Sequence, residues 1–361
     1  MNRLIIIGNG FDLAHGMKTS FRDFITDYYD NAVSVFRENN KFDDNLLSIK
    51  HSQSYEDDFH YISMNGFGDL PKALKDLNTQ WNVDITIKSK ILRKVNESIE
   101  TKNWVDIEKE YYNILGESTD PKKQIDVIEL NDEFDLLKTK LMAYLKRQQY
   151  DFSNDFDLFP LVDCFTQRIH YKELDNKRRK KILEPASLYF LNFNYTYTCE
   201  PYLKECRKKI KSSINYIHGS LDGKKGSPIF GFGDEFDKKF LEIEEKSDNE
   251  YFKHIKSFEY SKNENYSSLL AFVESDEFQV HIYGHSCGIS DRTMLRSIFE
   301  EDNCKSIKIF HHELKDGSND FVERTYEIYR HFNNKGIMRK KVVSQELCEP
   351  MPQPQRILEL N

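Results

Sequence analysis

The 361-residue sequence lacks long apolar runs and closely spaced cysteine pairs. No stretch approaches the roughly 20 apolar residues that a membrane-spanning helix needs, and the apolar run at the start is too short for a secretory signal. The six cysteines include no CxxC pair, so we expect neither a zinc ribbon nor a disulfide framework. We therefore expect a cytoplasmic protein with no metal site and no membrane contact.

An excess of positive charge is also absent. The chain has 52 Lys and Arg against 60 Asp and Glu residues, a formal net charge of −8. Such a chain has no general attraction for nucleic acid, so we do not expect direct nucleic-acid binding. The sequence is, by contrast, 13% aromatic, which is enough to build a substantial core.

Short apolar, β-branched runs alternate with helical patterns along much of the chain. The runs lie at residues 3–7, 187–191, 214–217, 228–230, 279–283 and 306–310. Helical spacing is found at 20–38, 197–211, 239–273, 291–301 and 321–333. This alternation predicts an α/β fold with a doubly wound, mostly parallel sheet of the Rossmann type.

One block interrupts the alternation. Residues 40–185 are rich in charge and mostly helical in pattern, which predicts a large helical insertion. The core would then comprise its first strand, glycine loop and helix (1–39) and a remainder (186–335). Residues 336–361 form a C-terminal tail, which is proline-rich from about residue 345 and which we expect to be poorly ordered there.

Within the insertion, Trp104 and Glu108 are spaced to share a helix face. A carboxylate beside a buried Trp has a raised pKa, which would suit proton transfer. A solvated charge at the edge of the apolar face explains the same spacing, and the role of the insertion stays open.

Polar turns follow the predicted strands directly. Ligands bind beyond the carboxyl ends of strands in open parallel sheets, so these turns should meet at one edge. In the first turn, Gly8 and Gly10 would let the backbone approach a ligand and adopt positive φ, and the next helix would direct N–H groups at phosphate. The turn is not a dinucleotide fingerprint, because Leu13 replaces the third glycine. A purely structural turn, with Asp12 capping the helix, is the alternative.

Two later turns carry candidates for chemistry. Asn192 and Asn194 alternate with apolar residues at a strand end, where asparagine is disfavoured without a reason. They could hydrogen-bond a sugar or an attacking water, or simply shape the turn. His218 ends the next strand and could be a general base near neutral pH, or a satisfied structural histidine.

A G-x-S-x-G pattern at Gly284, Ser286 and Gly288 is typical of serine hydrolases and would make Ser286 the nucleophile. The nucleophile elbow of such hydrolases needs a helix that begins directly after the serine. Here Ser290 or Asp291 looks like the N-cap, so the helix would begin several residues too late. We favour a loop that contacts ribose or adenine.

The segment LIIIGNGFDLAHGMKTSFRDF, at the start of the chain, resembles the opening of the bacteriophage abortive-infection AbiH family. NWVDIEKEY, YFLNFNYT, IHGS and IYGHSCGISD resemble the later motifs of that family, in order. The resemblance runs from residue 1 to about 335 and implies a part in phage defence.

The same order of turns is more distantly similar to sirtuin-like NAD-binding domains. That similarity implies that NAD is the ligand, that Asn194 polarises the ribose or water, and that His218 is the catalytic histidine. Thr196 stands where a sirtuin has aspartate, and the zinc module of the deacylases is missing. The residues that would contact the dinucleotide are Gly8, Asn9, Gly10, Phe11, Asp12, Asn192, Gly219, Ser220, Gly231, Gly233, Gly284, His285, Ser286 and Asp291.

We therefore predict an anti-phage protein that binds NAD and hydrolyses its nicotinamide–ribose bond, with His218 and Asn194 as the catalytic residues. The alternative is a sensor in phage defence that binds NAD or a related adenine nucleotide without turnover. A serine hydrolase is a minor alternative. A phage-derived trigger and self-association into a homo-oligomer stay open as further partners.

Overall fold

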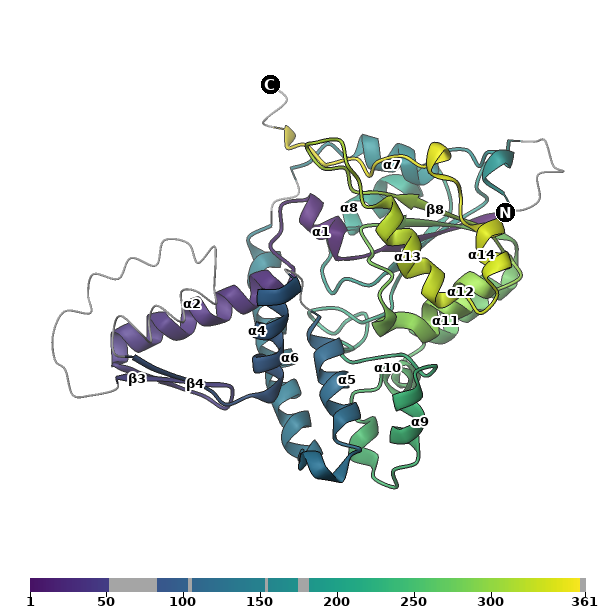
Figure 1. The fold of residues 1–361 in the computed structure, drawn as a ribbon. Helices are drawn as coiled ribbons and strands as arrows, with labels where there is room; N and C mark the ends of the chain where they lie inside the picture. The colour runs from purple at the N-terminus through teal and green to yellow at the C-terminus, as the bar shows by residue number, and fades with distance from the viewer. Residues whose placement is uncertain (52–82, 103–105, 153–154, 175–181, 358–361) are drawn as a thin grey trace. The chain divides into compact units, whose positions relative to one another are not determined.

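The chain divides into two compact units in the computed structural model, which describes residues 1–51, 83–102, 106–152, 155–174 and 182–357 (Figure 1). The core unit comprises Met1–Lys18, Leu145–Lys238 and His254–Asn361. The second unit comprises Thr19–Tyr144 and Lys239–Lys253. These limits differ from the expected insertion at 40–185, because the helix after the first turn already packs within the second unit.

A five-stranded, all-parallel sheet forms the centre of the core unit. Its strands lie in the order β6-β5-β1-β7-β8. They are β1 (Asn2–Ile7), β5 (Leu188–Asn192), β6 (Ser212–Tyr216), β7 (Phe278–Tyr283) and β8 (Cys304–Phe310). The predicted doubly wound α/β fold is confirmed. The run at 228–230 is not a strand, however; it lies in a loop where the Ile229 N–H donates to the His218 carbonyl.

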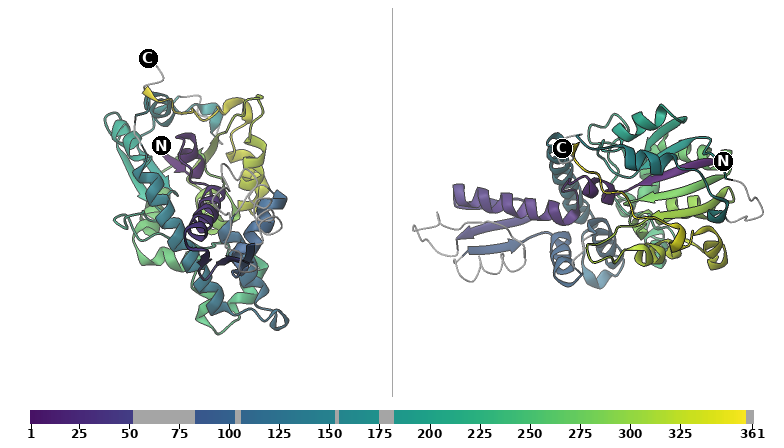
Figure 2. Two further views of the ribbon diagram at one scale, coloured as in Figure 1. Left: turned by 90° about the vertical axis from the view of Figure 1, so that its left-hand side faces the viewer. Right: turned by 90° about the horizontal axis from the view of Figure 1, so that it is seen from above.

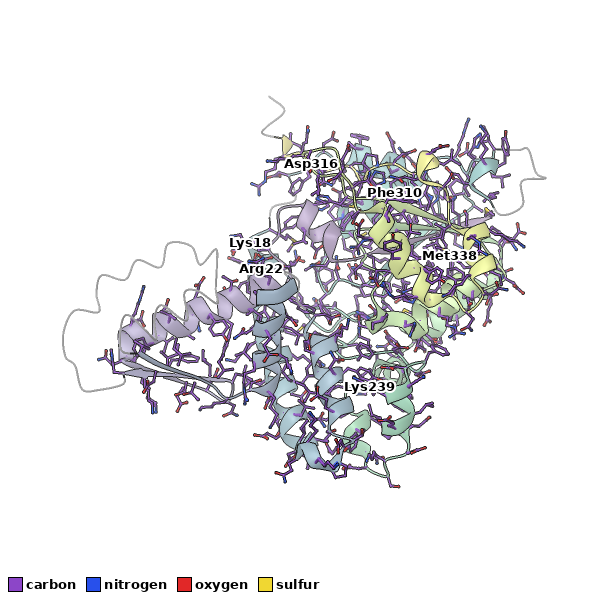
Figure 3. All side chains as sticks on the ribbon, viewed as in Figure 1. Lys18, Arg22, Lys239, Phe310, Asp316 and Met338 are labelled. Atoms are coloured by element: carbon purple, nitrogen blue, oxygen red, sulfur yellow. The ribbon has the colours of Figure 1, made fainter. Side chains whose placement is uncertain are left out.

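Helices lie on both faces of the sheet (Figure 2), and an apolar layer packs against each face. The side chains of Leu4 to Ile7 in β1 alternate between the layers, as the strand period requires, so this part of β1 is apolar on both faces. One layer is built from α11 (Asn265–Ser275), α12 (Arg292–Glu300), α13 (Phe321–His331) and α14 (Lys335–Lys341). The other is built from α1 (Asn9–Ala14), α7 (Phe159–Thr166) and α8 (Glu200–Arg207). Phe310 and Met338, both labelled in Figure 3, belong to opposite layers.

Residues 336–357 pack against the core, whereas we expected poor order from about residue 345. Met338 and Met351 are buried. The His311 N–H donates to the Glu349 carbonyl, and the Met351 N–H donates to the His311 carbonyl. Pro350 lies opposite His311 in this bridge, an edge position that proline tolerates. The prolines therefore mark an edge segment, which composition alone cannot distinguish from a tail.

The second unit combines helices with a small sheet that the sequence did not predict. Its antiparallel strands are β2 (Lys41–Asp43), β3 (Leu47–His51) and β4 (Val83–Ile87), and α2 (Phe21–Asn39) packs on them. Its other helices are α4 (Lys90–Lys102), α5 (Ile107–Glu117), most of α6 (Val127–Tyr150) and α9 (Lys238–Glu244).

The predicted pair of Trp104 and Glu108 is only partly described. Glu108 is buried in the first turn of α5, and Trp104 lies outside the described residues. No helix within the described ranges has the length and apolar character needed to cross a membrane.

Candidate functional site

The strand order reverses beside β1. The chain passes from β1 to β5 and β6 on one side, and then crosses to β7 and β8 on the other. In doubly wound sheets, ligands bind beyond the carboxyl ends of the strands at such a switch point. Here those ends carry the turns that begin at Gly8 after β1 and at Gly284 after β7.

Close packing between these two turns explains their glycines. A Cβ atom on Gly8 would overlap the Cα of His285, and one on Gly10 would lie 2.8 Å from the Cα of Gly284. Gly284 has a φ of 64°, which favours glycine. We expected positive φ at Gly8 and Gly10, but Gly8 has a φ of −125° and Gly10 is helical. The glycines therefore let two turns touch each other.

The phosphate cradle that we expected at this turn is not formed by Gly8 and Gly10 in this structure. The Gly8 N–H donates to the Tyr283 carbonyl at 3.0 Å, and the Gly10 N–H donates to the Gly284 carbonyl at 2.7 Å. The Phe11 N–H donates to the Gly8 carbonyl at 2.9 Å. These three donors are used inside the fold and offer no N–H group to a phosphate.

We expect Gly10→Ala to lower the free energy of unfolding by about 1–3 kcal/mol, the usual cost of overpacking. Alanine favours a helix, but its Cβ would meet the Gly284 backbone, which cannot rotate away. Urea denaturation measures the change. Gly288→Ala is the matched control, because its Cβ would meet nothing closer than 3.5 Å and should cost less than about 0.5 kcal/mol. Equal stabilities for the two variants would contradict the packing role.

Asp12, on α1, lies in a cluster of polar side chains from the loop after β5. Its Oδ2 atom accepts a hydrogen bond of 2.6 Å from the Thr196 hydroxyl, and the N-cap position of α1 is held by Gly8. Burial raises the pKa of Asp12 to about 6, although Thr196, Thr198 and Asn194 favour its charged form. We call Asp12, Asn194, Thr196 and Thr198 the carboxylate cluster.

The two asparagines of this loop have different roles. Asn194 donates from Nδ2 to the Gly8 carbonyl at 3.0 Å, which fixes its amide beside the first turn. Asn192 accepts from the Asn194 N–H at 3.1 Å and donates to the Thr196 carbonyl at 3.4 Å. Asn192 therefore shapes the loop, as in the structural alternative, while Asn194 lies at the edge of the site.

A second group of buried polar residues surrounds Asp291. Its Oδ1 atom is 2.8 Å from the Lys256 ammonium and 3.2 Å from His218 Nε2. Its Oδ2 atom is 3.9 Å from His285 Nε2, and the Tyr260 hydroxyl is 3.2 Å from His218 Nε2. We call these five residues the histidine cluster. Asp291 holds the N-cap position of α12 but makes no capping bond, so its charge serves this cluster instead.

The electrostatics of the histidine cluster keep both imidazoles neutral near pH 7. Burial lowers the pKa of His218, and Lys256 lowers it further while Asp291 opposes them. Burial likewise lowers the pKa of His285 to about 3. For Asp291, burial would raise the pKa, but Lys256 and His218 outweigh it and hold the pKa well below its usual range. Within the described ranges, no group of His, Cys, Asp or Glu is placed to hold a metal ion.

The two clusters meet at Gly8. Its carbonyl accepts from Asn194, and its Cα packs against His285. The Phe193 ring lies between the histidines, with its centroid 5.1 Å from that of His218 and 4.1 Å from that of His285. The chain thus brings Asp12, Asn194, His218, His285 and Asp291 to one edge of the sheet, as the placement of the turns predicted.

The remaining predicted residues support the turns. The Gly233 N–H donates to the Ser290 carbonyl at 2.9 Å, and Gly231 lies against the His254 backbone. Gly219 has a φ of 76°, and the Ser220 hydroxyl donates to Asp222. These contacts are within the fold and neither require nor exclude a ligand.

Ser286 is exposed and its hydroxyl accepts from the Gly288 N–H at 3.3 Å. A nucleophile elbow needs a helix directly after the serine, but α12 begins only at Arg292. The positive φ of 53° falls on Cys287 rather than on the serine. The serine-hydrolase alternative thus lacks its supporting geometry.

A cavity of about 350 Å³ in the core unit lies against α7 and α8. It contains none of the predicted site residues. Its lining residues are Phe156, Asp157, Leu158, Phe159, Val162, Glu205, Lys208, Lys209 and Ile357.

Two important members of the site were missed from the sequence. Lys256 and Tyr260 lie in the charged stretch 239–273, for which we predicted a helical pattern. In the structure this stretch is broken into short turns, and Lys256 is fully buried. Nothing in one sequence distinguishes a buried lysine in such a stretch from its exposed neighbours.

Comparison with known proteins adds one finding. A family model described as bacteriophage abortive infection AbiH matches residues 4–312, which include both clusters. No curated protein matches the chain.

Proposed function

The chain belongs to the bacteriophage abortive infection AbiH family, and on that premise we propose that it serves phage defence by binding NAD and hydrolysing the nicotinamide–ribose bond. The observation that carries the proposal is the meeting of two buried titratable clusters at the switch point of a doubly wound sheet. This is where such folds bind nucleotides. Loss of NAD would stop the infected cell and the phage together.

The proposed reaction makes three demands on the site. Departure of nicotinamide leaves an oxocarbenium-like ribose, so the site must orient the ribose, position a water and accept its proton. Asn194 suits the first two demands, because its Nδ2 group is fixed by the Gly8 carbonyl and its amide oxygen can accept from a hydroxyl or a water. Asp291 lies 3.2 Å from His218 Nε2 and orients the ring, and burial lowers the pKa of His218, so a neutral imidazole is held where it can contact the ribose.

We expect NAD to fall, and nicotinamide and ADP-ribose to appear, when cells that express the protein are infected by a phage to which it responds. Purified protein from those cells should release nicotinamide, and Asn194→Ala should lower kcat at least about 100-fold. Liquid chromatography of the nucleotides measures both effects. Asn303→Ala is the control, because Asn303 donates to the Val273 carbonyl before β8, at the opposite edge of the sheet.

The outcomes separate the two candidate functions. Stable NAD in infected cells, together with no release by the purified protein, would contradict hydrolysis. Tight, stoichiometric binding of NAD without product would instead favour the nucleotide sensor.

A further inference from the structure

Asp12 is a buried carboxylate at the switch point to which the proposed function gives no role in the chemistry. We infer that Asp12 Oδ1 accepts the proton of the attacking water in the hydrolysis of NAD, and this inference rests on the proposed function. Asp12 is then a catalytic residue, and Thr196 is the positioning residue that holds its other oxygen.

The two oxygens of Asp12 differ in their surroundings. Oδ2 accepts from the Thr196 hydroxyl at 2.6 Å, and Thr196 is in turn 3.3 Å from the Thr198 hydroxyl. Oδ1 has no hydrogen-bond partner at normal distance among the described residues, although Asp12 is only 1% exposed and Thr198 and Asn194 lie close enough to favour its charged form. A buried carboxylate oxygen without a donor opposes folding, so a structural role alone does not explain it. It is placed to receive a proton from a bound molecule.

A role for Asp12 at the end of its own helix does not account for the residue. Gly8 holds the N-cap position of α1, and Asp12 lies inside this six-residue helix. The Oδ2 atom of Asp12 is hydrogen-bonded to Thr196. The nearby N–H groups of Gly10 and Phe11 donate to the Gly284 and Gly8 carbonyls. The partners of the carboxylate come instead from the loop after β5, which also carries Asn194.

His218, the base that the sequence predicted, is less available. Its Nε2 atom has the Asp291 carboxylate and the Tyr260 hydroxyl within 3.2 Å, and a bond to the Phe193 carbonyl also engages the ring. Lys256 and His285 face the same carboxylate and disfavour a second positive charge. Proton transfer to His218 would require these contacts to rearrange, whereas transfer to Asp12 Oδ1 would not.

The proposed step balances. The electron pair of the bond between nicotinamide nitrogen and ribose C1′ leaves with nicotinamide, which becomes neutral. The water oxygen forms a bond to C1′, and one of its protons passes to Asp12 Oδ1 and then to solvent. The ionised carboxylate also stabilises the positive charge that develops on the ribose. The pKa of about 6 leaves the carboxylate mostly ionised above pH 7 and still basic enough to take a proton.

The test measures kcat and KM for nicotinamide release between pH 5 and pH 9, with calorimetry of NAD binding. We expect Asp12→Asn to lower kcat at least about 100-fold and to change the dissociation constant of NAD by less than about threefold. In the wild-type protein, kcat should fall as the pH drops through about 6. Thr196→Val should move this fall to higher pH, because the Thr196 hydroxyl favours the ionised carboxylate. Asp163→Asn, on the exposed face of α7, is the matched control and should change neither constant.

Each outcome has one interpretation. If the wild-type protein releases nicotinamide and Asp12→Asn does so equally fast, or Thr196→Val leaves the pH profile unmoved, the inference is wrong and the proposed function stands. If the wild-type protein releases none under any condition, the proposed function and the inference both fail.

Discussion

Replacing Lys256 by methionine should lower the free energy of unfolding by about 3–5 kcal/mol, because it leaves Asp291 charged and buried without its cation. Lys256 is 0% exposed, and its ammonium lies 2.8 Å from Asp291 Oδ1. Methionine keeps most of the volume of the lysine side chain, so the loss reports the charge rather than a cavity. Urea denaturation near pH 7 measures it.

Two further variants make this expectation specific. Arg168→Met removes one partner of an exposed ion pair with Glu184 and should cost at most about 1 kcal/mol. Adding Asp291→Asn to Lys256→Met should recover much of the lost stability, because the buried charge is then gone. A double variant as unstable as Lys256→Met would show that Lys256 acts through packing instead.

The second large effect is a gain in stability. We expect Asp12→Asn to raise the free energy of unfolding by about 3 kcal/mol at pH 8 and to have almost no effect near pH 4. The pKa of Asp12 is about 6 in the folded chain, against an ordinary value of 3.8, so between these pH values the folded chain binds more protons than the unfolded chain. The contribution of Asp12 to stability therefore falls as the pH rises from about 4 to about 6. Asparagine can still accept a hydrogen bond from the Thr196 hydroxyl. Because it does not titrate, the variant lacks the fall in stability that Asp12 causes between these pH values.

Urea denaturation of the variant and the wild-type protein at several pH values measures the gain. The difference between the two isolates Asp12 from other buried groups, such as His15 and His331, whose pKa values burial lowers to about 4. Asp163→Asn, on the exposed face of α7, is the control and should change the free energy of unfolding by less than about 0.5 kcal/mol. A loss of stability at pH 8, or a gain that does not change with pH, would contradict the assignment. A residue that costs stability and is retained is typical of a functional site.

The main features of the core followed from the sequence, because buried parallel strands are apolar and β-branched and their turns are polar. The runs at 3–7 and 279–283 became the neighbouring central strands, with Ile7 paired to Tyr283. The run at 228–230 is also apolar, but it begins with proline, and its backbone bond to His218 does not extend into a strand pairing. Hydrophobicity indicates that a segment is buried, and only the partners decide whether it is a strand.

The sequence indicated which turns carry the candidate site, but it did not indicate how the residues of those turns contact one another. Gly8 and Gly10 looked like ligand-facing glycines, and a single sequence cannot distinguish a ligand from another turn as the cause of a close approach. Asp291 looked like a helix cap because the sequence shows that it precedes a helix but not which distant side chains surround it. Its partner Lys256 is distant along the chain and has no periodic pattern that points to it.

The central position of β1 also determines when the site can exist during synthesis. β1 leaves the ribosome first, but its neighbours begin at Leu188 and Phe278. At about 5–20 residues per second, β1 waits about 10–40 s for β5 and longer for β7. The contact of Gly8 with His285 can form only after β7 is made. A chain that ends before β7 therefore cannot form this contact between the two turns.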